Sequence, residues 1–457
     1  MRPFVWQWLA ISSLLLGGLA ASAETRPQYG GTLRVMTRAT LSSIDPGDTT
    51  QPDSFARRTV LSLLFDTLVT TDQSGRPVGS LAQAWQAARG NQRLQIRLRA
   101  GVRFQDGTPL SGAIVASTLR RVNPSWDIVA DGDSIVIGSG SSEGELLQEL
   151  ALPRNAVAKR DSEDKLSGTG PFRLVDWQVG KKLTLAADDN CWRGRPFLDG
   201  IDIDLDVNFR DQMTALELNR SDLIEVAPEQ INHISPERFH LAHSAPIELL
   251  ALMFTLDASS VEEKTLRQAL RSSVERTSMH SVLLQGAGQA TAALLPTWSS
   301  GYGFVFPAEA DLAKARQLRN SVKSVPTWTV EYDSHNPLAR LLAERIALNA
   351  RDAGLSVRPT TSGGAGLRLA QIPLVSPDPW VSWDKLLTQL ALPASESKGH
   401  SIEDLYAEEQ GVLATNRIIP LFHLPASYAS ESGLRGWTVR TDGSLDLAKA
   451  WLRAPQP

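Results

Sequence analysis

Few residues in this 457-residue chain have the types and spacing that chemistry on a ligand would need. His240 and His243 lie three residues apart, a spacing that would place both imidazoles on one face of a helix and could hold a metal ion. No cluster of carboxylates or thiolates accompanies them in the sequence. We therefore expect two surface histidines and no metal site.

A glycine-rich turn is a second candidate. The run 134–144 (SIVIGSGSSEG) leads from an apolar strand through glycines toward a helical pattern at Leu146, Leu147 and Leu150. Such a turn can bring the backbone close to the pyrophosphate of a dinucleotide. Glu143 would place a negative charge where that phosphate should lie. We therefore expect a strand and a helix of a small subdomain, and no cofactor.

The only cysteine, Cys191, is a third candidate. A single cysteine cannot form a disulfide within the chain, and we expect a small, half-buried side chain rather than a reactive thiol. The sequence also lacks a nucleophile elbow and any cluster of metal ligands, so we predict no catalytic residues. A secreted hydrolase remains a weaker alternative.

Length and charge limit the function classes. A chain of 457 residues exceeds what one hydrophobic core supports, so two or more lobes are expected. The hydrophobic content of 42% and the charged content of 21% are those of an ordinary globular protein. The formal net charge of −4 leaves no basic surplus to neutralise phosphates, which argues against a nucleic-acid partner.

The N-terminal segment resembles a secretory leader. Arg2 precedes an apolar run from Leu9 to Leu19, and Ala21-Ser22-Ala23 offers a cleavage site for signal peptidase. The alternative is a membrane anchor, but the run is short for a span of about 20 residues. We therefore predict that residues 1–23 are a signal peptide removed after Ala23. No cysteine lies near this site, so the protein should not be lipidated and should be free in the periplasm.

The stretch 168–201 (GTGPFRLVDWQVGKKLTLAADDNCWRGRPFLDGI) has the clearest local pattern. A glycine-rich turn leads into apolar residues spaced two apart, which predicts a β-hairpin with its tip near Gly180. A second turn with Gly194 and Pro196 then precedes the alternating strand at Ile201, Ile203 and Leu205.

This stretch resembles the signature of family 5 of the extracytoplasmic solute-binding proteins, which serve peptide, nickel and opine ABC importers. The family pattern is roughly GTGP(F/Y), a Trp, a Gly, an apolar strand, then YW-x-G-x-P-x-(L/I)-D-x-(I/V), and Cys191 stands where the family usually has Tyr. Further matches come in order along the chain, at 29–35 (YGGTLRV), 44–46 (IDP), 75–85 (GRPVGSLAQAW), 103–110 (RFQDGTPL), 266–276 (LRQALRSSVER) and 286–290 (GAGQA).

The resemblance implies an α/β fold of two lobes, the class II type of periplasmic binding protein, with a small extra subdomain in lobe I. Lobe I would comprise residues 24–248 and 420–457, with the subdomain at about 55–165, and lobe II residues 249–419. The chain would cross between the lobes near Leu249–Thr255 and near Asn416–Phe422. A helix at Met213–Leu218 should end in a turn where Asn219 takes the left-handed conformation that the family's Gly would supply.

The implied function is to bind a small solute or peptide between the lobes by hinge closure and to deliver it to an ABC permease in the inner membrane. Such a protein would act as a monomer, without a cofactor, a metal ion or catalysis. A binding protein that feeds a signalling receptor remains an alternative.

The implied ligand contacts depart from the peptide-binding pattern. Peptide binders carry approximately W-x-x-D-Y-x-D-P in lobe II, whose first Asp accepts the α-ammonium group of the ligand; here Ile372 and Val375 occupy the Trp and Asp positions and only Asp378-Pro379 remains. A buried ammonium without a counter-charge is costly, so a neutral solute is expected. The predicted ligand-binding residues are Thr50, Gln51, Thr255, Trp298, Val375, Asp378, Trp380 and Trp383. For Trp380 and Trp383, packing in the core is the first expectation, and an aromatic wall of the interlobe cleft is the alternative.

Overall fold

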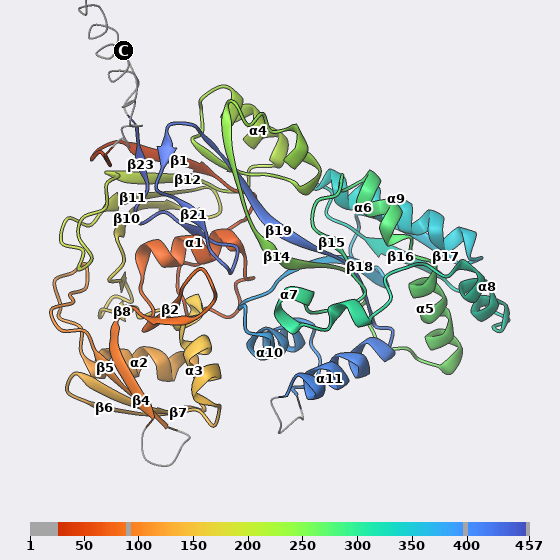
Figure 1. Ribbon diagram of the computed structural model, residues 1–457, viewed down its shortest axis with the longest axis horizontal. Coiled ribbons are helices and arrows are strands. Elements are labelled where there is room, and N and C mark those ends of the chain that lie inside the picture. Colours follow the sequence, from red (N-terminus) through yellow and green to blue (C-terminus); the bar gives the residue numbers. More distant parts are fainter. Residues whose placement is uncertain (1–25, 88–92, 396–400, 454–457) are drawn as a thin grey trace, which may run out of the picture.

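The computed structural model describes residues 26–87, 93–395 and 401–453. They form a mixed α/β structure around one sheet of eleven strands, whose order is β10-β11-β12-β1-β13-β19-β14-β18-β16-β17, with β15 paired to β19 off this path (Figure 1). Residues 1–23, predicted to be a signal peptide, lie outside the described residues. Among the described residues, none of the helices is long and apolar enough to cross a membrane.

One half of the large sheet is built from five strands near the N-terminus. These are β1 (Thr32–Met36), β10 (Phe172–Gln178), β11 (Lys182–Ala187), β12 (Gly200–Asp204) and β13 (Leu223–Glu225). Strand β1 pairs in parallel with β12 and β13, whereas β10, β11 and β12 form an antiparallel meander, which confirms the hairpin predicted from the sequence.

Helix α1 (Phe55–Leu64) covers this half of the sheet. Its side chains Val60, Leu61 and Leu64 share a core with the inward residues Leu33 and Leu185 of the sheet. Apolar and polar residues alternate in β11, so this strand has one buried face. Helix α1 supplies the apolar surface against which that face packs.

Shorter elements complete this region. They are α4 (Phe209–Glu217), β2 (Val69–Thr71), β3 (Pro77–Gly79), β8 (Lys159–Arg160), β9 (Leu166–Ser167), β20 (Leu434–Arg435), β21 (Thr438–Val439), β22 (Leu445–Asp446), β23 (Trp451–Leu452) and the 3-10 turns η1 (Pro153–Asn155) and η2 (Pro228–His233). After α4, Asn219 has a φ of 54°, so the left-handed turn predicted there is confirmed.

A separate small sheet lies at one end of the molecule (Figure 1). It has the order β4-β5-β7-β6, made by β4 (Ala82–Ala87), β5 (Arg93–Leu98), β6 (Asp127–Asp131) and β7 (Ser134–Gly138). Helices α2 (Gly112–Val122) and α3 (Glu143–Leu150) close its core, whose buried residues fall between 68 and 157.

The glycine-rich turn after β7 leads into helix α3, as predicted, and Ser142 caps that helix. The Ser142 side chain accepts a hydrogen bond from the Glu145 backbone N–H, and Glu145 bonds back to the Ser142 backbone, so the start of α3 satisfies its own donors. With acidic residues in its first turn, this helix end is not suited to a phosphate.

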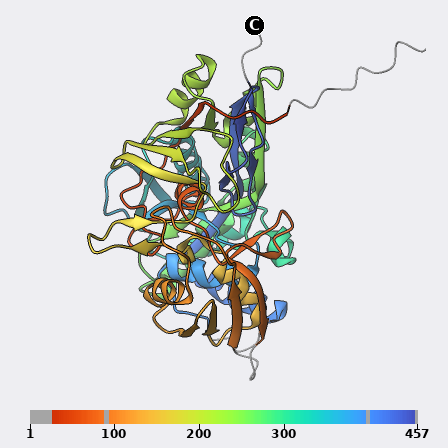
Figure 2. The same ribbon diagram turned by 90° about the vertical axis from the view of Figure 1, so that its left-hand side faces the viewer.

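Two long antiparallel strands connect the two halves of the molecule. β14 (Phe239–Phe254) and β19 (Ile418–Glu431) pair from Phe239 with Glu431 to Met253 with Ile418, and they run side by side in both views (Figure 1, Figure 2). Both strands are longer than the crossings predicted from the sequence. Pro246 faces Pro425 where the register shifts, and because proline has no N–H this is the weakest point of the ladder.

The other half of the sheet continues from β14 through β18 (Leu367–Pro373), β16 (Thr327–Glu331) and β17 (Ser356–Thr360). Seven helices, the turn η3 and the short strand β15 surround it: α5 (Val261–Ser273), α6 (Arg276–Val282), α7 (Thr297–Ser300), α8 (Leu312–Asn320), α9 (Pro337–Asp352), α10 (Pro379–Gln389), α11 (Ile402–Ala414), η3 (Gly303–Val305) and β15 (Gln289–Ala290).

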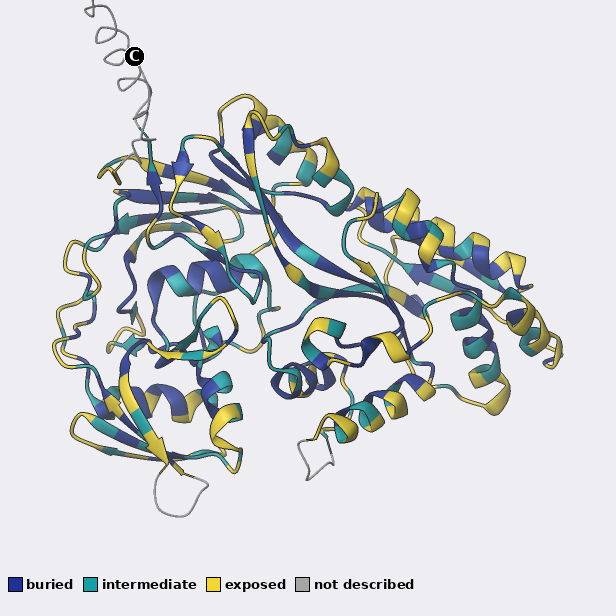
Figure 3. Ribbon diagram, viewed as in Figure 1, coloured by how far each residue is buried: buried dark blue, intermediate teal, exposed yellow. Residues whose placement is uncertain are grey.

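Side chains on the two faces of β14 enter two different cores. Leu250 and Leu252 pack with residues of α5 and α9, whereas Leu249 and Ala251 pack with residues of α10 and α11. The sheet is therefore covered on both sides here, and the middle of β14 and β19 is buried (Figure 3). We propose the division predicted from the sequence. Below, lobe I denotes residues 24–248 and 420–457, and lobe II denotes residues 249–419.

Both histidines are exposed, as expected, although the helix considered for them is not formed. His240 and His243 lie in strand β14 and not in a helix, so a three-residue spacing directs them to opposite faces. His240 packs its ring against the edge of Trp437, with 5.6 Å between ring centroids. In the described residues there is no group of three or more His, Cys, Asp and Glu side chains placed to hold a metal ion.

Tertiary packing explains two glycines of the 168–201 stretch. Neither Gly168 nor Gly170 has a positive φ. Instead, both lie against the last turn of α1: an added Cβ would come within 1.9 Å of the Leu64 carbonyl oxygen at Gly168 and within 2.4 Å of the Leu63 carbonyl oxygen at Gly170. Gly170 also donates its N–H to the Leu64 carbonyl at 3.1 Å. Close approach of two backbones, rather than turn geometry, requires glycine here.

Replacing Gly168 by alanine should therefore force α1 away from the sheet and lower the free energy of unfolding by roughly 1–3 kcal/mol or more. Gly144→Ala is the matched control, because this glycine is exposed in α3 and an added Cβ meets nothing within 4 Å. Urea denaturation of both variants measures the difference. A Gly168→Ala protein as stable as Gly144→Ala would show that the close approach carries no energetic weight.

Candidate functional site

The two lobes meet at the segment that follows β18. The Leu374 N–H donates to the Ile247 carbonyl at 2.8 Å, which continues the β14–β18 ladder past Pro373. The chain then turns into α10, where the Asp378 side chain accepts hydrogen bonds from the backbone N–H groups of Trp380 and Val381, each at 3.0 Å. Asp378 is thus the N-cap of α10.

A buried arginine of lobe I reaches this segment. Arg58 on α1 is 1% exposed and donates to the Leu374 carbonyl oxygen at 2.9 Å and to the Asp442 carbonyl oxygen at 2.5 Å. Its guanidinium also forms an ion pair with Asp53 at 2.5 Å. A buried charge is tolerated only when its donors are paired, and Arg58 obtains its partners from both lobes.

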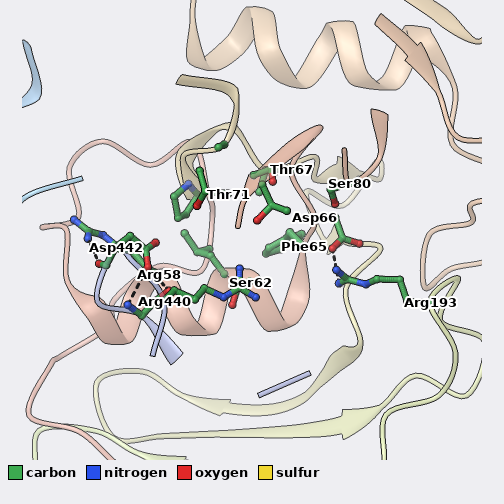
Figure 4. Close-up of a pocket in the computed structure, with 16 residues that line it drawn as sticks. Arg58, Ser62, Phe65, Asp66, Thr67, Thr71, Ser80, Arg193, Arg440 and Asp442 are labelled. Atoms are coloured by element: carbon green, nitrogen blue, oxygen red, sulfur yellow. Dashed lines mark hydrogen bonds and ion pairs between the residues drawn. The ribbon is translucent and has the colours of Figure 1, made fainter. Parts of the chain in front are cut away.

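A small polar pocket borders Arg58 (Figure 4). It is lined by residues of α1, by Ser80 and by the segment near Arg440 and Asp442, and its volume is about 60 Å³. This is room for a few water molecules, well below the several hundred Å³ of a typical ligand pocket.

The charged groups of that pocket already have partners. Arg193 pairs with Asp66 at 2.6 Å, as Figure 4 shows, and Arg440 pairs with Asp446 at 3.2 Å. Asp66 also accepts hydrogen bonds from Thr169 and from the Trp192 indole, both at 2.9 Å. These bonds tie the 168–201 stretch to the residues that follow α1, so we assign the pocket a structural role.

A second polar group lies where β1 and β13 of lobe I face β16 and β18 of lobe II. Arg38, just after β1, forms an ion pair with Asp333 at 3.2 Å and donates to Gln371 at 3.3 Å. Glu225 accepts hydrogen bonds from the Thr37 hydroxyl and from the Arg38 backbone N–H, each at 2.7 Å. Two lobe II side chains therefore meet a lobe I cation across the junction.

Glu248 is the unusual residue of this junction. It lies on β14, opposite Leu424 of β19 and opposite Pro373 of β18. Its side chain is partly accessible to solvent, and the structure shows no hydrogen bond or ion pair for its carboxylate among the described residues. Burial raises the pKa of Glu248 to about 7; Arg38 and Arg58 act against this rise, and Glu225 adds to it.

Three of the predicted ligand-binding residues lie near this segment. Val375 follows Leu374 directly and is partly buried. The Trp298 indole, 42% exposed, donates to the Pro246 carbonyl at 2.8 Å, and its neighbour Ser299 donates to the Pro377 carbonyl at 3.1 Å. The structure thus brings Trp298 into the same neighbourhood as Val375 and Asp378.

The other predicted polar residues are placed elsewhere. Gln51 uses its amide oxygen to hold Ser42 and Ser43 within a loop of lobe I, and Thr50 is exposed and bonds to Asp48. Thr255 lies beyond the lobe II end of β14, where its hydroxyl donates to the Gly366 carbonyl at 3.3 Å. Within the described part of the chain, no hydrogen bond or ion pair joins these side chains to the junction.

The aromatic wall considered for Trp380 and Trp383 is corrected by the structure. Trp383 is 0% exposed and Trp380 8%, and both belong to the core shared with α11. The Trp383 indole donates to Glu408 at 2.7 Å. Their spacing on α10 turns both side chains into the core, so packing in the core, the first expectation, describes them.

The free cysteine lies in the interior of the protein. Cys191 is buried, 7% exposed, and burial raises the pKa of its thiol, which disfavours the reactive thiolate.

Sequence reasoning missed Arg58, Arg38 and Glu248. The signal for Arg58 and Glu248 was a charge inside an apolar run, 55–64 (FARRTVLSLL) for the arginine and 246–254 (PIELLALMF) for the glutamate. A charged residue in a strand or helix that is otherwise core must find a partner or face a site. Arg38, in a loop, offered no such signal.

Removing the Arg58 guanidinium should destabilise the protein by about 3–5 kcal/mol, because it leaves Asp53 and two carbonyl groups without their Arg58 partner. We expect Arg58→Met to lower the unfolding midpoint in urea accordingly. Arg93→Met is the control, since Arg93 and Asp127 form an exposed pair, 51% and 59% accessible, of the kind that contributes little. Equal midpoints for the two variants would contradict a supporting role for Arg58.

Comparisons with known proteins place the chain among solute-binding proteins. Residues 76–371 match the family model "Bacterial extracellular solute-binding proteins, family 5 Middle". The nickel-binding protein NikA of Staphylococcus aureus is 25% identical over 239 residues, 48% of this chain and 48% of that protein. The oligopeptide-binding protein AppA of Bacillus subtilis is 24% identical over 341 residues, 67% of this chain and 60% of that protein. The matches thus span about half of NikA and less than two thirds of AppA.

Solved structures extend the likeness over nearly the whole chain. The dipeptide-binding protein of Pseudoalteromonas sp. SM9913, crystallised in complex with Met-Leu, superposes with a TM-score of 0.79 at 16% identity, covering 93% of this chain and 100% of that one. At this identity the likeness concerns the fold, and it confirms the two-lobed α/β architecture predicted from the sequence.

Proposed function

The chain belongs to family 5 of the bacterial extracellular solute-binding proteins, and from this premise we propose that it binds a small solute or peptide between its lobes and delivers it to an ABC importer. The observation that carries the proposal is the junction itself. Polar side chains of both lobes face each other there, next to the paired prolines Pro246 and Pro425 of the connecting strands.

The geometry of the connecting strands supports hinge closure. The register of the β14–β19 ladder shifts on both sides of the two prolines, and once more between Leu250 and Ala251. Because the prolines donate no hydrogen bond, a bend there breaks few of them. The Arg38–Asp333 pair and the bond from Arg58 to Leu374 are the contacts that closure makes and opening breaks. A permease would then recognise the closed form.

Relatives differ in what their names say they bind, and this leaves the solute class open at the family level. One is a nickel-binding protein, one an oligopeptide-binding protein, and the protein crystallised with Met-Leu is a dipeptide-binding protein. For this chain we propose no catalytic step and a monomeric, non-lipidated protein in the periplasm.

Protein purified from a periplasmic extract should carry a small molecule that denaturation releases and mass spectrometry detects. After removal of that molecule, small-angle scattering should show a larger radius of gyration than the loaded protein, because the lobes open about the hinge. Serum albumin carried through the same extract and release steps is the control for non-specific adsorption. An unchanged radius of gyration at ligand saturation would count against hinge closure.

Export should leave Glu24 as the first residue of the mature protein, because Ala21-Ser22-Ala23 fits the cleavage site of a signal peptidase. N-terminal sequencing of the periplasmic fraction checks this. Ala23→Leu, which blocks such a site, should retain the precursor in the membrane fraction. A mature protein that begins at Met1, or that carries a lipid, would refute the prediction.

A further inference from the structure

The peptide binders of this family need a carboxylate where this chain has Val375, and the structure shows a carboxylate close to that position on the neighbouring strand. Glu248 of β14 lies opposite Pro373 of β18, and residues directly opposite in an antiparallel pair point to the same face. Leu374 enters the core together with Ile247, so it points to the other face. Because alternate residues of an extended chain share a face, Val375 lies on the side of Glu248, as its diagonal neighbour.

The surroundings of Glu248 have an excess of negative charge. Glu229 and Asp333 act on the Arg38 guanidinium, by charge and by ion pair respectively. Glu225 accepts a hydrogen bond from the Arg38 backbone N–H, and its charge helps to raise the pKa of Glu248. Arg58, the other cation that acts on Glu248, is committed to Asp53.

Two further observations indicate that this cluster of charged side chains lacks a binding partner in the structure. One carboxylate oxygen of Glu229, Oε2, is buried without a hydrogen-bond partner in the described part of the chain, and so is the Nε of Arg38. Glu248 itself is half-buried and forms no hydrogen bond or ion pair with the other described residues. A buried polar group without a partner is costly, and a site that binds a ligand is a common reason for one.

We propose that Glu248 recognises a protonated primary amine of the transported solute, and that it replaces from the adjacent strand the aspartate that other family members carry at the position of Val375. The inference rests on the proposed solute-binding function and names the chemistry of the solute. It reverses the expectation of a neutral ligand, which considered position 375 alone. A metal ion is the less suitable occupant, because no three metal-ligating side chains are grouped in the described residues.

The test uses the mature protein freed of ligand by unfolding and refolding. Its probes are the small-molecule fraction of a periplasmic extract, before and after acetylation of primary amines with acetic anhydride, and the pair Met-Leu and N-acetyl-Met-Leu. We expect a ligand to be retained from the untreated fraction and not from the acetylated one, with detection by native mass spectrometry.

The variants assign the effect to Glu248. Glu248→Gln should weaken binding of the retained amine about 30-fold or more, the loss typical when one partner of a buried charge pair is removed. Glu237→Gln makes the same charge change on the exposed surface and should leave affinity unchanged. Adding Val375→Asp to Glu248→Gln should restore part of the affinity, because it returns a carboxylate to the same face. Unfolding in urea confirms that each variant is folded.

The other outcomes would contradict one or both proposals. Retention of a ligand from the acetylated fraction at equal strength would overturn the inference and leave the proposed function intact, as would a Glu248→Gln protein with unchanged affinity for the amine. Failure to retain any molecule from either fraction, together with no binding of Met-Leu, would contradict both proposals.

Discussion

Everything in this molecule depends on one pair of strands. The β14–β19 ladder joins the halves of an eleven-stranded sheet. Its backbone register therefore sets which residues of the two lobes come into contact. That ladder is rigid where hydrogen bonds are complete and weakest where Pro246 faces Pro425. The hinge that we propose is therefore set by two residues that cannot donate a bond, and the residues beside it, Glu248 and Leu374, are carried into the junction by the same pairing.

Charge in the junction is arranged in two different ways. Arg58 is buried with partners from both lobes, which makes it a support that holds lobe I on the segment before Val375. Glu248 is half-buried and has no hydrogen bond or ion pair among the described residues, and burial raises its pKa to about 7. A satisfied buried charge stabilises one arrangement of the lobes, whereas an unsatisfied one favours the arrival of a complementary group. The contrast separates the structural part of the junction from the part that we assign to the ligand.

Much of the local structure could be predicted from the sequence. The hairpin of β10 and β11, the capped helix α3 and the left-handed Asn219 follow from spacing and turn chemistry, which act over a few residues. What the local patterns left open was decided at longer range. His240 and His243 have a spacing that suits a helix, but the pairing of β14 with β19 makes them strand residues, and Trp380 and Trp383 were drawn into a core that only the packing of α11 on α10 creates.

The sequence by itself determined the family, the two-lobed fold and the absence of an aspartate at position 375, because motifs and residue identities are read along the chain. Only the tertiary structure decided what that absence means. Position 248 lies far from position 375 in the chain, and the register of β14 against β18 pairs Glu248 with Pro373, two residues before Val375. A carboxylate acts through space and not through sequence, so the transfer that we propose from one strand to the next is invisible until the strands are paired.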